Sequence, residues 1–234
     1  MIRCLNCGTE YEGNFCPHCG QKGTVDKITL PFLINDFLSR FMDIDKGMLF
    51  NLKHLTLHPK KTIFNYLLGK RKNVLNPVSY ALIATSLYLL ITSQFEIHWI
   101  EKVELEKFKG AAYNNSFEAG KIIGTYTKFF WLLNILFLSI FSRLFFKKFS
   151  FLEHLAMNCF IHGHTTLLGI LTFIPFRLPV VYDPFVFLYL IILNFMIFQK
   201  KGERFEIFVA AFFSVFFSYI LFYMVPFILV LISK

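Results

Sequence analysis

Long apolar runs fill the last two thirds of the chain, and they constrain its fold more than any other feature. The 234 residues are 56% hydrophobic and 17% charged, whereas a soluble domain usually carries about 25% charged residues. This much apolar surface excludes intrinsic disorder, and the content of 12 Gly and 5 Cys excludes collagen-like and disulfide-dense chains. The composition predicts an all-α integral membrane protein.

A helix needs about 20 mostly apolar residues to cross a bilayer. The candidate spans are 78–95, 129–146, 151–174, 180–198 and 205–232. The fourth is the weakest, because Asp183-Pro184 has the pattern of an N-cap followed by proline, which shortens a helix. A tilted or re-entrant segment is its alternative. Pro175 is expected to end the third span and Pro226 to kink the fifth.

The charges of the connecting segments predict an orientation. Residues 1–77 hold 11 Lys and Arg, whereas 96–128 holds five Lys and five Glu. Trp99 lies near the start of this neutral segment and Trp131 just after its end. Basic residues concentrate on the cytosolic side, and aromatic residues at the interfaces. No apolar signal segment opens the chain. We therefore expect a multi-pass protein of the cytoplasmic (inner) membrane with a cytosolic N-terminus and a C-terminus outside.

Three zones follow from composition: 1–23, rich in Cys and Gly; a basic linker, 24–76; and the apolar domain, 77–234. The first zone contains Cys4-Leu-Asn-Cys7-Gly and Cys16-Pro-His-Cys19-Gly. Zinc prefers four tetrahedral ligands, and each C-x2-C turn brings two sulfurs to one side of an ion. The following glycines permit the tight turn that such a knuckle requires. The spacing predicts a structural zinc ribbon with Cys4, Cys7, Cys16 and Cys19 as ligands.

Other readings of these cysteines stay open, namely a redox C-x-x-C and an iron–sulfur cluster, but neither has its usual sequence context. His18 is expected at the surface and Cys159 in helix packing. Residues 1–23 contain only Arg3 and Lys22 as basic residues, so we expect no nucleic-acid partner. A contact with a cytosolic protein, or a simple role in folding, is the expected use of the ribbon.

The linker carries apolar residues at helical spacing from Leu30 to Phe41 and again after His58-Pro59. Five basic residues bracket the second helix: Lys60, Lys61, Lys70, Arg71 and Lys72. Apolar faces with basic ends are typical of amphipathic helices on an anionic inner leaflet. Packing against the cytosolic ends of the spans is the alternative, since both arrangements bury the same apolar face.

The third span is the most polar, and it begins with a predicted Ser150/Glu153 capping box. Glu153, His154, His162 and His164 are the candidate intramembrane functional residues, because ionisable groups in a span often mark a function. His162 and His164 lie roughly 200° apart on a helix and cannot chelate one ion. Neutral histidines that bond helices together and a proton or ion pathway are the two interpretations.

Three sequence elements carry a resemblance. They are Cys4-x2-Cys7-Gly with Asn14-Phe15-Cys16-Pro17-x-Cys19-Gly20-Gln21-Lys22; Asp45-Lys46-Gly47-Met48-Leu49 with the segments at His58-Pro59-Lys60-Lys61 and Asn76-Pro77-Val78-Ser79-Tyr80; and Glu153-His154 with His162-x-His164. Together they resemble an uncharacterised bacterial inner-membrane family, a domain of unknown function with an N-terminal zinc ribbon. The resemblance covers residues 1 to 175 and implies no activity.

Three function classes remain after this reading: a membrane protein that contacts a cytosolic protein through its ribbon, a small transporter, channel or subunit that uses the His-bearing third span, and an intramembrane metalloenzyme. No Ser/His/Asp set, paired carboxylates or Gly-rich phosphate loop is present. The sequence therefore names no catalytic residue, and the enzyme class ranks last.

Overall fold

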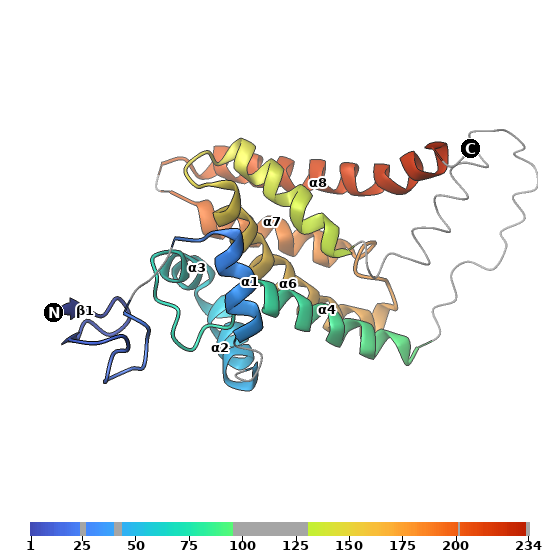
Figure 1. Ribbon diagram of the computed structural model, residues 1–234. Coiled ribbons are helices and arrows are strands. Elements are labelled where there is room, and N and C mark those ends of the chain that lie inside the picture. The colour runs from blue at the N-terminus through green and yellow to red at the C-terminus, as the bar shows by residue number, and fades with distance from the viewer. Residues whose placement is uncertain (24–26, 40–43, 96–130, 201, 233–234) are drawn as a thin grey trace, which may run out of the picture.

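The computed structural model describes residues 1–23, 27–39, 44–95, 131–200 and 202–232. It is mostly helical, with a two-stranded sheet near the N-terminus. Figure 1 shows the N-terminal module (residues 1–23) at one end of an elongated helical bundle and the end of α8 at the other. The neutral segment 96–128, with Trp99, lies outside the described residues.

The sheet pairs β1 (Ile2–Arg3) with β2 (Glu10–Tyr11) in antiparallel register. The linker contains α1 (Leu30–Ser39), α2 (Ile44–Leu57) and α3 (Pro59–Leu67). The bundle consists of α4 (Pro77–Ser93), the helix Trp131–Phe145, α6 (Phe151–Phe176), α7 (Pro184–Phe198) and α8 (Arg204–Ile232). Each bundle helix coincides with one of the predicted apolar stretches.

Side-chain caps set where the bundle helices begin. The Ser150 hydroxyl accepts from the Glu153 backbone N–H, and the Glu153 carboxylate accepts from the Ser150 N–H at 2.8 Å, which confirms the capping box. The Asp183 carboxylate accepts from the backbone N–H of Phe185, and Pro184 is the first helical residue of α7. This confirms the shortened fourth helix, because 180–183 precedes the helix. Pro175 does not end α6, which continues to Phe176.

Length separates the five predicted spans into two groups. Only α6, with 26 residues, and α8, with 29, are both long and apolar enough to cross a membrane within the described part of the chain. The helices α4 and α7 have 17 and 15 residues, and the helix Trp131–Phe145 is also short. At a rise of about 1.5 Å per residue these fall short of the bilayer core of about 30 Å. The structure therefore supports two candidate spans and not the predicted five.

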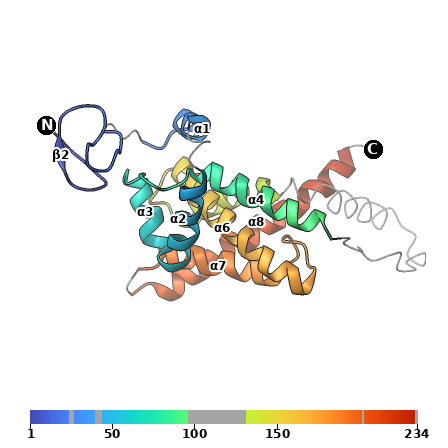
Figure 2. The ribbon, with the colours of Figure 1, turned by 90° about the horizontal axis from the view of Figure 1, so that it is seen from below.

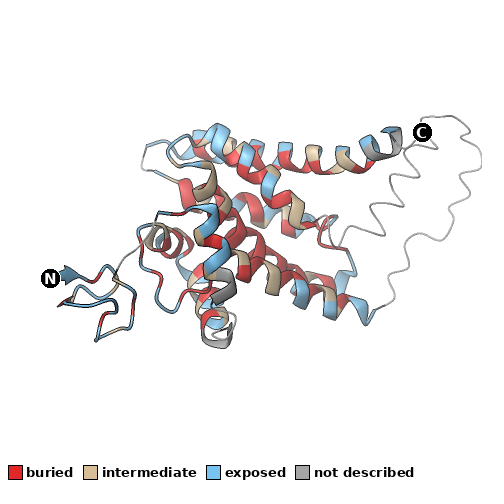
Figure 3. Cartoon of the chain, viewed as in Figure 1, coloured by how far each residue is buried: buried red, intermediate tan, exposed pale blue. Residues whose placement is uncertain are grey.

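Helix α6 is the centre of the bundle. It packs against α4 on one side and α7 on another, and α7 packs against α8. The helix Trp131–Phe145 contacts both α6 and α8: the Trp131 indole donates to the Thr166 hydroxyl of α6 at 2.8 Å, and the Phe141 ring lies 5.6 Å from that of Phe217. Figure 3 shows α6 mostly buried and α8 buried along one side only. Polar groups on α6 therefore face other helices, whereas much of α8 is open to its surroundings.

The linker helices lie against the end of the bundle nearest the N-terminal module, as Figure 2 shows. Ile63 and Tyr66 of α3 are each 1% exposed, and the Tyr66 ring lies 5.2 Å from that of Phe160 in α6. Arg71, one of the basic residues for which a leaflet surface and packing were the alternatives, is buried with its guanidinium 4.2 Å from the Phe32 ring. A guanidinium stacks on aromatic rings more readily than an ammonium does, so Arg71 serves packing within the protein.

Two asparagines attach the linker helices to the start of α4. The Asn51 amide of α2 both accepts from the Leu75 N–H and donates to the Leu75 carbonyl, at 3.2 and 3.1 Å. Asn76 caps α4 and donates to Asp36 of α1 at 2.9 Å. Both asparagines are fully buried, so these bonds fix the entry into the first bundle helix.

Candidate metal centre

The two C-x2-C segments adopt the same backbone turn. The Gly8 N–H donates to the Cys4 carbonyl at 2.9 Å, and the Gly20 N–H donates to the Cys16 carbonyl at 2.8 Å. Both glycines have left-handed backbones, with φ of 81° and 70°. An L side chain is strained there, so the predicted role of the two glycines is confirmed.

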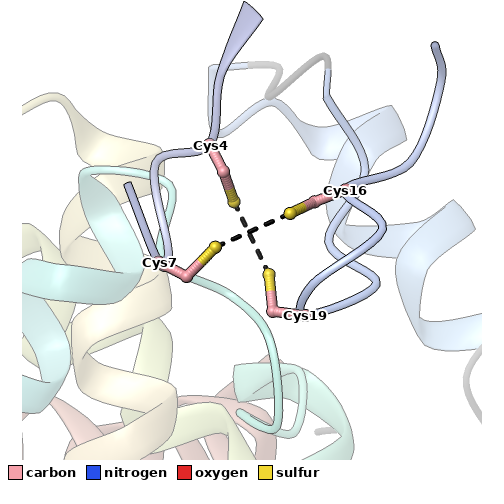
Figure 4. Close-up of side chains that lie close together, drawn as sticks. All are labelled: Cys4, Cys7, Cys16 and Cys19. Carbon is pink, nitrogen blue, oxygen red and sulfur yellow. Dashed lines mark hydrogen bonds between the residues drawn. The ribbon is translucent and has the colours of Figure 1, made fainter. Parts of the chain in front are cut away.

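The two turns face each other and bring their four sulfur atoms together, as Figure 4 shows. All four lie within 4.8 Å of one another, with Cys4 and Cys19 at 3.5 Å and Cys7 and Cys16 at 3.6 Å. All four cysteines are free. In a zinc tetrahedron with Zn–S bonds of about 2.3 Å, neighbouring sulfurs are about 3.8 Å apart. The cluster could therefore hold one metal ion, and zinc fits its four thiol ligands.

The surroundings of the four thiols shift their pKa values in different directions. Hydrogen bonding with Thr9, through its hydroxyl and then its backbone N–H, lowers the pKa of Cys7 to about 5. A bond from the Cys7 N–H lowers the pKa of Cys4, whereas burial raises the pKa of Cys19 to about 11. Since the thiolate is the ligand, Cys7 is prepared for metal at neutral pH. The charge of the ion itself would have to deprotonate Cys19.

The side chain of Gln21 connects the N-terminal module to the linker by hydrogen bonds. Gln21, two residues after Cys19, is buried; its amide donates to the Gly69 carbonyl at 2.9 Å and accepts from the Arg71 N–H at 3.2 Å. Both partners belong to the connection between α3 and α4. The module is thus held at a fixed place on the linker. Nothing in the sequence pattern indicates this contact, because it joins residues 48 and 50 positions apart.

The module turns apolar side chains outward. Its own core is small and consists of Tyr11 with the cysteines. Phe15 is 64% exposed, Leu5 48% and Ile2 41%. His18 is exposed, as the sequence suggested. A module of this size cannot bury enough apolar surface to fold without help, so the ligands must organise it and leave these side chains available.

The structure assigns local roles to three of the four candidate residues on α6. Glu153 forms the cap described above. The ring of the buried His154 bonds the Ser142 hydroxyl at 3.0 Å and donates to the Phe146 carbonyl at 2.9 Å. The ring of His164 lies 2.9 Å from the Tyr80 hydroxyl of α4. These two histidines bond helices together.

His162 differs from the other two. It is 1% exposed, its ring centroid lies 4.1 Å from that of Trp131, and neither ring nitrogen has a hydrogen-bond partner among the described residues. It points to a different neighbour from His164, which agrees with the angle expected between them. Cys159 packs against Ala81 and Ile135 and is not part of the metal cluster.

His162 belongs to a buried polar column on α6. On α6 it recurs at every fourth residue, from His154 through Asn158 and His162 to Thr166, so these side chains share one face. Further buried side chains on the other helices also have amide or hydroxyl atoms without a partner in the described chain: Asn134, Asn194 and Tyr219. The side-chain oxygen of Asn158 also has no hydrogen-bond partner among the described residues. Sequence reasoning identified the histidines and noted Asn194, but it did not identify Asn134 or Tyr219.

No protein-family model, curated protein or solved structure matches this chain. The resemblance to an uncharacterised bacterial inner-membrane family therefore stays a prediction. The cysteine cluster, which is one part of that resemblance, is present in the structure.

Proposed function

We propose that the chain is an integral membrane protein of the cytoplasmic membrane, and that its five bundle helices insert together. The support is the outward surface of the bundle. Large apolar side chains stand exposed on the helix Trp131–Phe145, α7 and α8, where a soluble protein would carry polar groups. No charged residue occurs in α4 or α7. Local thinning of the bilayer and snorkelling lysines accommodate helices that are too short.

The proposed orientation places the metal centre in the cytosol and the end of α8 outside. Its support is the distribution of basic residues and the arrangement in Figure 1, in which the two ends of the chain lie at opposite ends of the bundle. The cysteines then lie in a reducing compartment, where metal binding is favoured over disulfides.

The proposed role of the N-terminal module is to bind a cytosolic protein and hold it at the membrane. One observation carries it: the module is fixed to the helices through Gln21 and at the same time presents Phe15 at 64% exposure. An aromatic side chain on a module that is already anchored binds a partner at a lower entropy cost than one on a free segment. A role in folding alone would need neither the fixed position nor the exposed ring. Residues 1–23 lack a basic surface, so a nucleic-acid partner is not proposed.

A photo-crosslinking amino acid at Phe15 is expected to give one discrete protein adduct in whole cells. Leu68 is the matched control, because it is 70% exposed but lies in the α3–α4 connection. Phe15→Ser should weaken recovery of that partner about 30-fold, as expected for loss of an aromatic hot spot, with the metal content unchanged. Equal adducts at both positions, or none at Phe15, would reduce the module to a folding element.

The buried polar column favours a second candidate, a transporter or channel for a proton, ion or small polar solute. Each buried polar atom without a partner costs about 1–3 kcal/mol. Several such atoms occur in the bundle helices, on His162, Asn134 and Tyr219 among others. The rings of His162 and Tyr219 both lie next to the Trp131 ring, at 4.1 and 6.2 Å. Groups that destabilise the fold are typical of functional sites. No observation favours the metalloenzyme class, which is not proposed.

Replacing His162 with leucine is expected to raise the unfolding temperature by a few degrees, because it removes two unpartnered nitrogens. His164→Leu is the matched control and should lower it, because His164 loses its bond to Tyr80. For the transport candidate, His162→Leu should also abolish pH-dependent flux in proteoliposomes. Unchanged flux would refute transport through this column, and a loss of stability would show that His162 has a partner.

A further inference from the structure

A pocket of about 390 Å³ opens at the end of the bundle that the proposed orientation places at the inner leaflet. It lies where the start of α3, the connection before α6, the end of α7 and the start of α8 meet. Its volume falls within the range of about 300–1,000 Å³ that small-molecule sites occupy. The inference below rests on the proposed membrane insertion.

The floor of the pocket is aromatic. The rings of Phe146 and Phe198 stack at 4.0 Å with an angle of 7°, and those of Phe64 and Phe149 meet edge to face at 5.4 Å. The carbonyl of Phe146 is held by the His154 ring at 2.9 Å. The floor therefore rests on a fixed turn and does not need to form when a ligand arrives.

The rim of the pocket is cationic. Its four lysines outnumber its two glutamates: Lys60, Lys147, Lys148 and Lys200 against Glu203 and Glu206. Lys200 pairs with Glu203 at 3.3 Å, and Lys60 donates to the Gln199 carbonyl. Lys147 and Lys148 make no ion pair with any described residue, and the Lys148 ammonium lies 5.5 Å from the Phe149 ring centroid. Two positive charges thus stand next to an apolar floor.

We propose that this pocket binds the headgroup of an anionic phospholipid. Lysine ammonium groups bind phosphate as point charges, and basic pockets between helices on the cytoplasmic side suit acidic headgroups. Ile207 and Ala210 of α8 also line the pocket, and the neighbouring Phe205 and Phe208 of the same helix are 79% and 44% exposed. An acyl chain can follow this helix from the pocket. The combination of aromatic floor and cationic rim matches an amphiphile and not a soluble polyanion.

The proposal is tested by native mass spectrometry of the full-length, metal-bearing protein with added phosphatidylglycerol or phosphatidylethanolamine of identical acyl chains. One phosphatidylglycerol should bind at least about tenfold more tightly. Lys147→Gln with Lys148→Gln should weaken it about 30-fold, as expected for two lysines near a phosphate. Lys61→Gln with Lys70→Gln removes the same charge from exposed lysines outside the pocket and should change binding less than about twofold.

Three results would overturn the lipid site. They are equal binding of the two lipids, equal losses in the two double variants, and full competition by glycerol phosphate, which would indicate a soluble phosphate ligand. Membrane insertion is tested by a different measurement. If alkaline carbonate extracts the chain from cell membranes, the proposed insertion is wrong. A chain that stays in the membrane without phosphatidylglycerol preference refutes the inference and leaves the proposed function intact.

Discussion

Cys16→Ser is expected to reduce the bound metal of the purified protein from about one ion per chain to near zero. Cys16 is 1% exposed, and its sulfur lies 3.6 Å from that of Cys7, inside the cluster of four sulfurs. In zinc-finger peptides the metal supplies about 10–16 kcal/mol of folding free energy. Loss of one ligand should therefore unfold residues 1–23 while the helices stay folded.

Elemental analysis gives the metal content, and limited trypsin digestion gives the fold, because cleavage after Lys22 should become fast in the variant. Cys159→Ser is the control: that residue lies in α6 against Ala81 and Ile135 and should leave the metal in place. Full metal content in Cys16→Ser would contradict the ligand assignment. So would native protein that carries no metal and four reactive thiols.

Gly163→Ala is expected to give the largest loss of stability from a single added methyl group. A Cβ at this position would lie 3.0 Å from the Ala81 Cα, 3.1 Å from the Ala81 nitrogen and 2.9 Å from a Tyr80 ring carbon. Two of these atoms are backbone, so α4 itself must move away from α6. Overpacking of this kind costs about 1–3 kcal/mol, or roughly 2–12 °C in unfolding temperature.

Gly169→Ala provides the graded comparison. Its Cβ would meet the terminal methyl groups of Val180 and Val186, both at 3.2 Å. Side chains adjust at lower cost than backbone, so the loss should be smaller. The fluorescence of Trp131, which is buried next to α6, can follow unfolding of both variants. Equal stability of the two would show that α4 and α6 do not approach as closely as the structure has them.

The features that sequence reasoning predicted are local ones. The metal turns, the Ser150/Glu153 box and the start of α7 at Pro184 each depend on residues within four positions of one another. In such segments the side chain and the backbone it bonds are fixed by the same few torsion angles. Their chemistry can therefore be read from a short stretch of sequence.

The features that it missed depend on partners far along the chain. For Arg71 the sequence leaves a lipid surface and packing within the protein as alternatives, because its charge is visible in the sequence and the rings of Phe32 and Tyr66 that cover it are not. Hydropathy also overestimated helix length at 180–183, because Val180 and Val181 are buried in a turn rather than in a helix. Apolar residues indicate that a segment is buried, but they do not indicate whether lipid or protein covers it.

The bond from Gln21 to the helices has a thermodynamic consequence for the metal. If residues 1–23 unfold, the Gly69 carbonyl and the Arg71 N–H lose their partner, so release of the ion also removes two contacts from the helical part. By linkage, the intact chain must hold its ion more tightly than the same cysteines would in a free peptide. The linker thereby contributes to the affinity of a site whose four ligands all lie in residues 1–23.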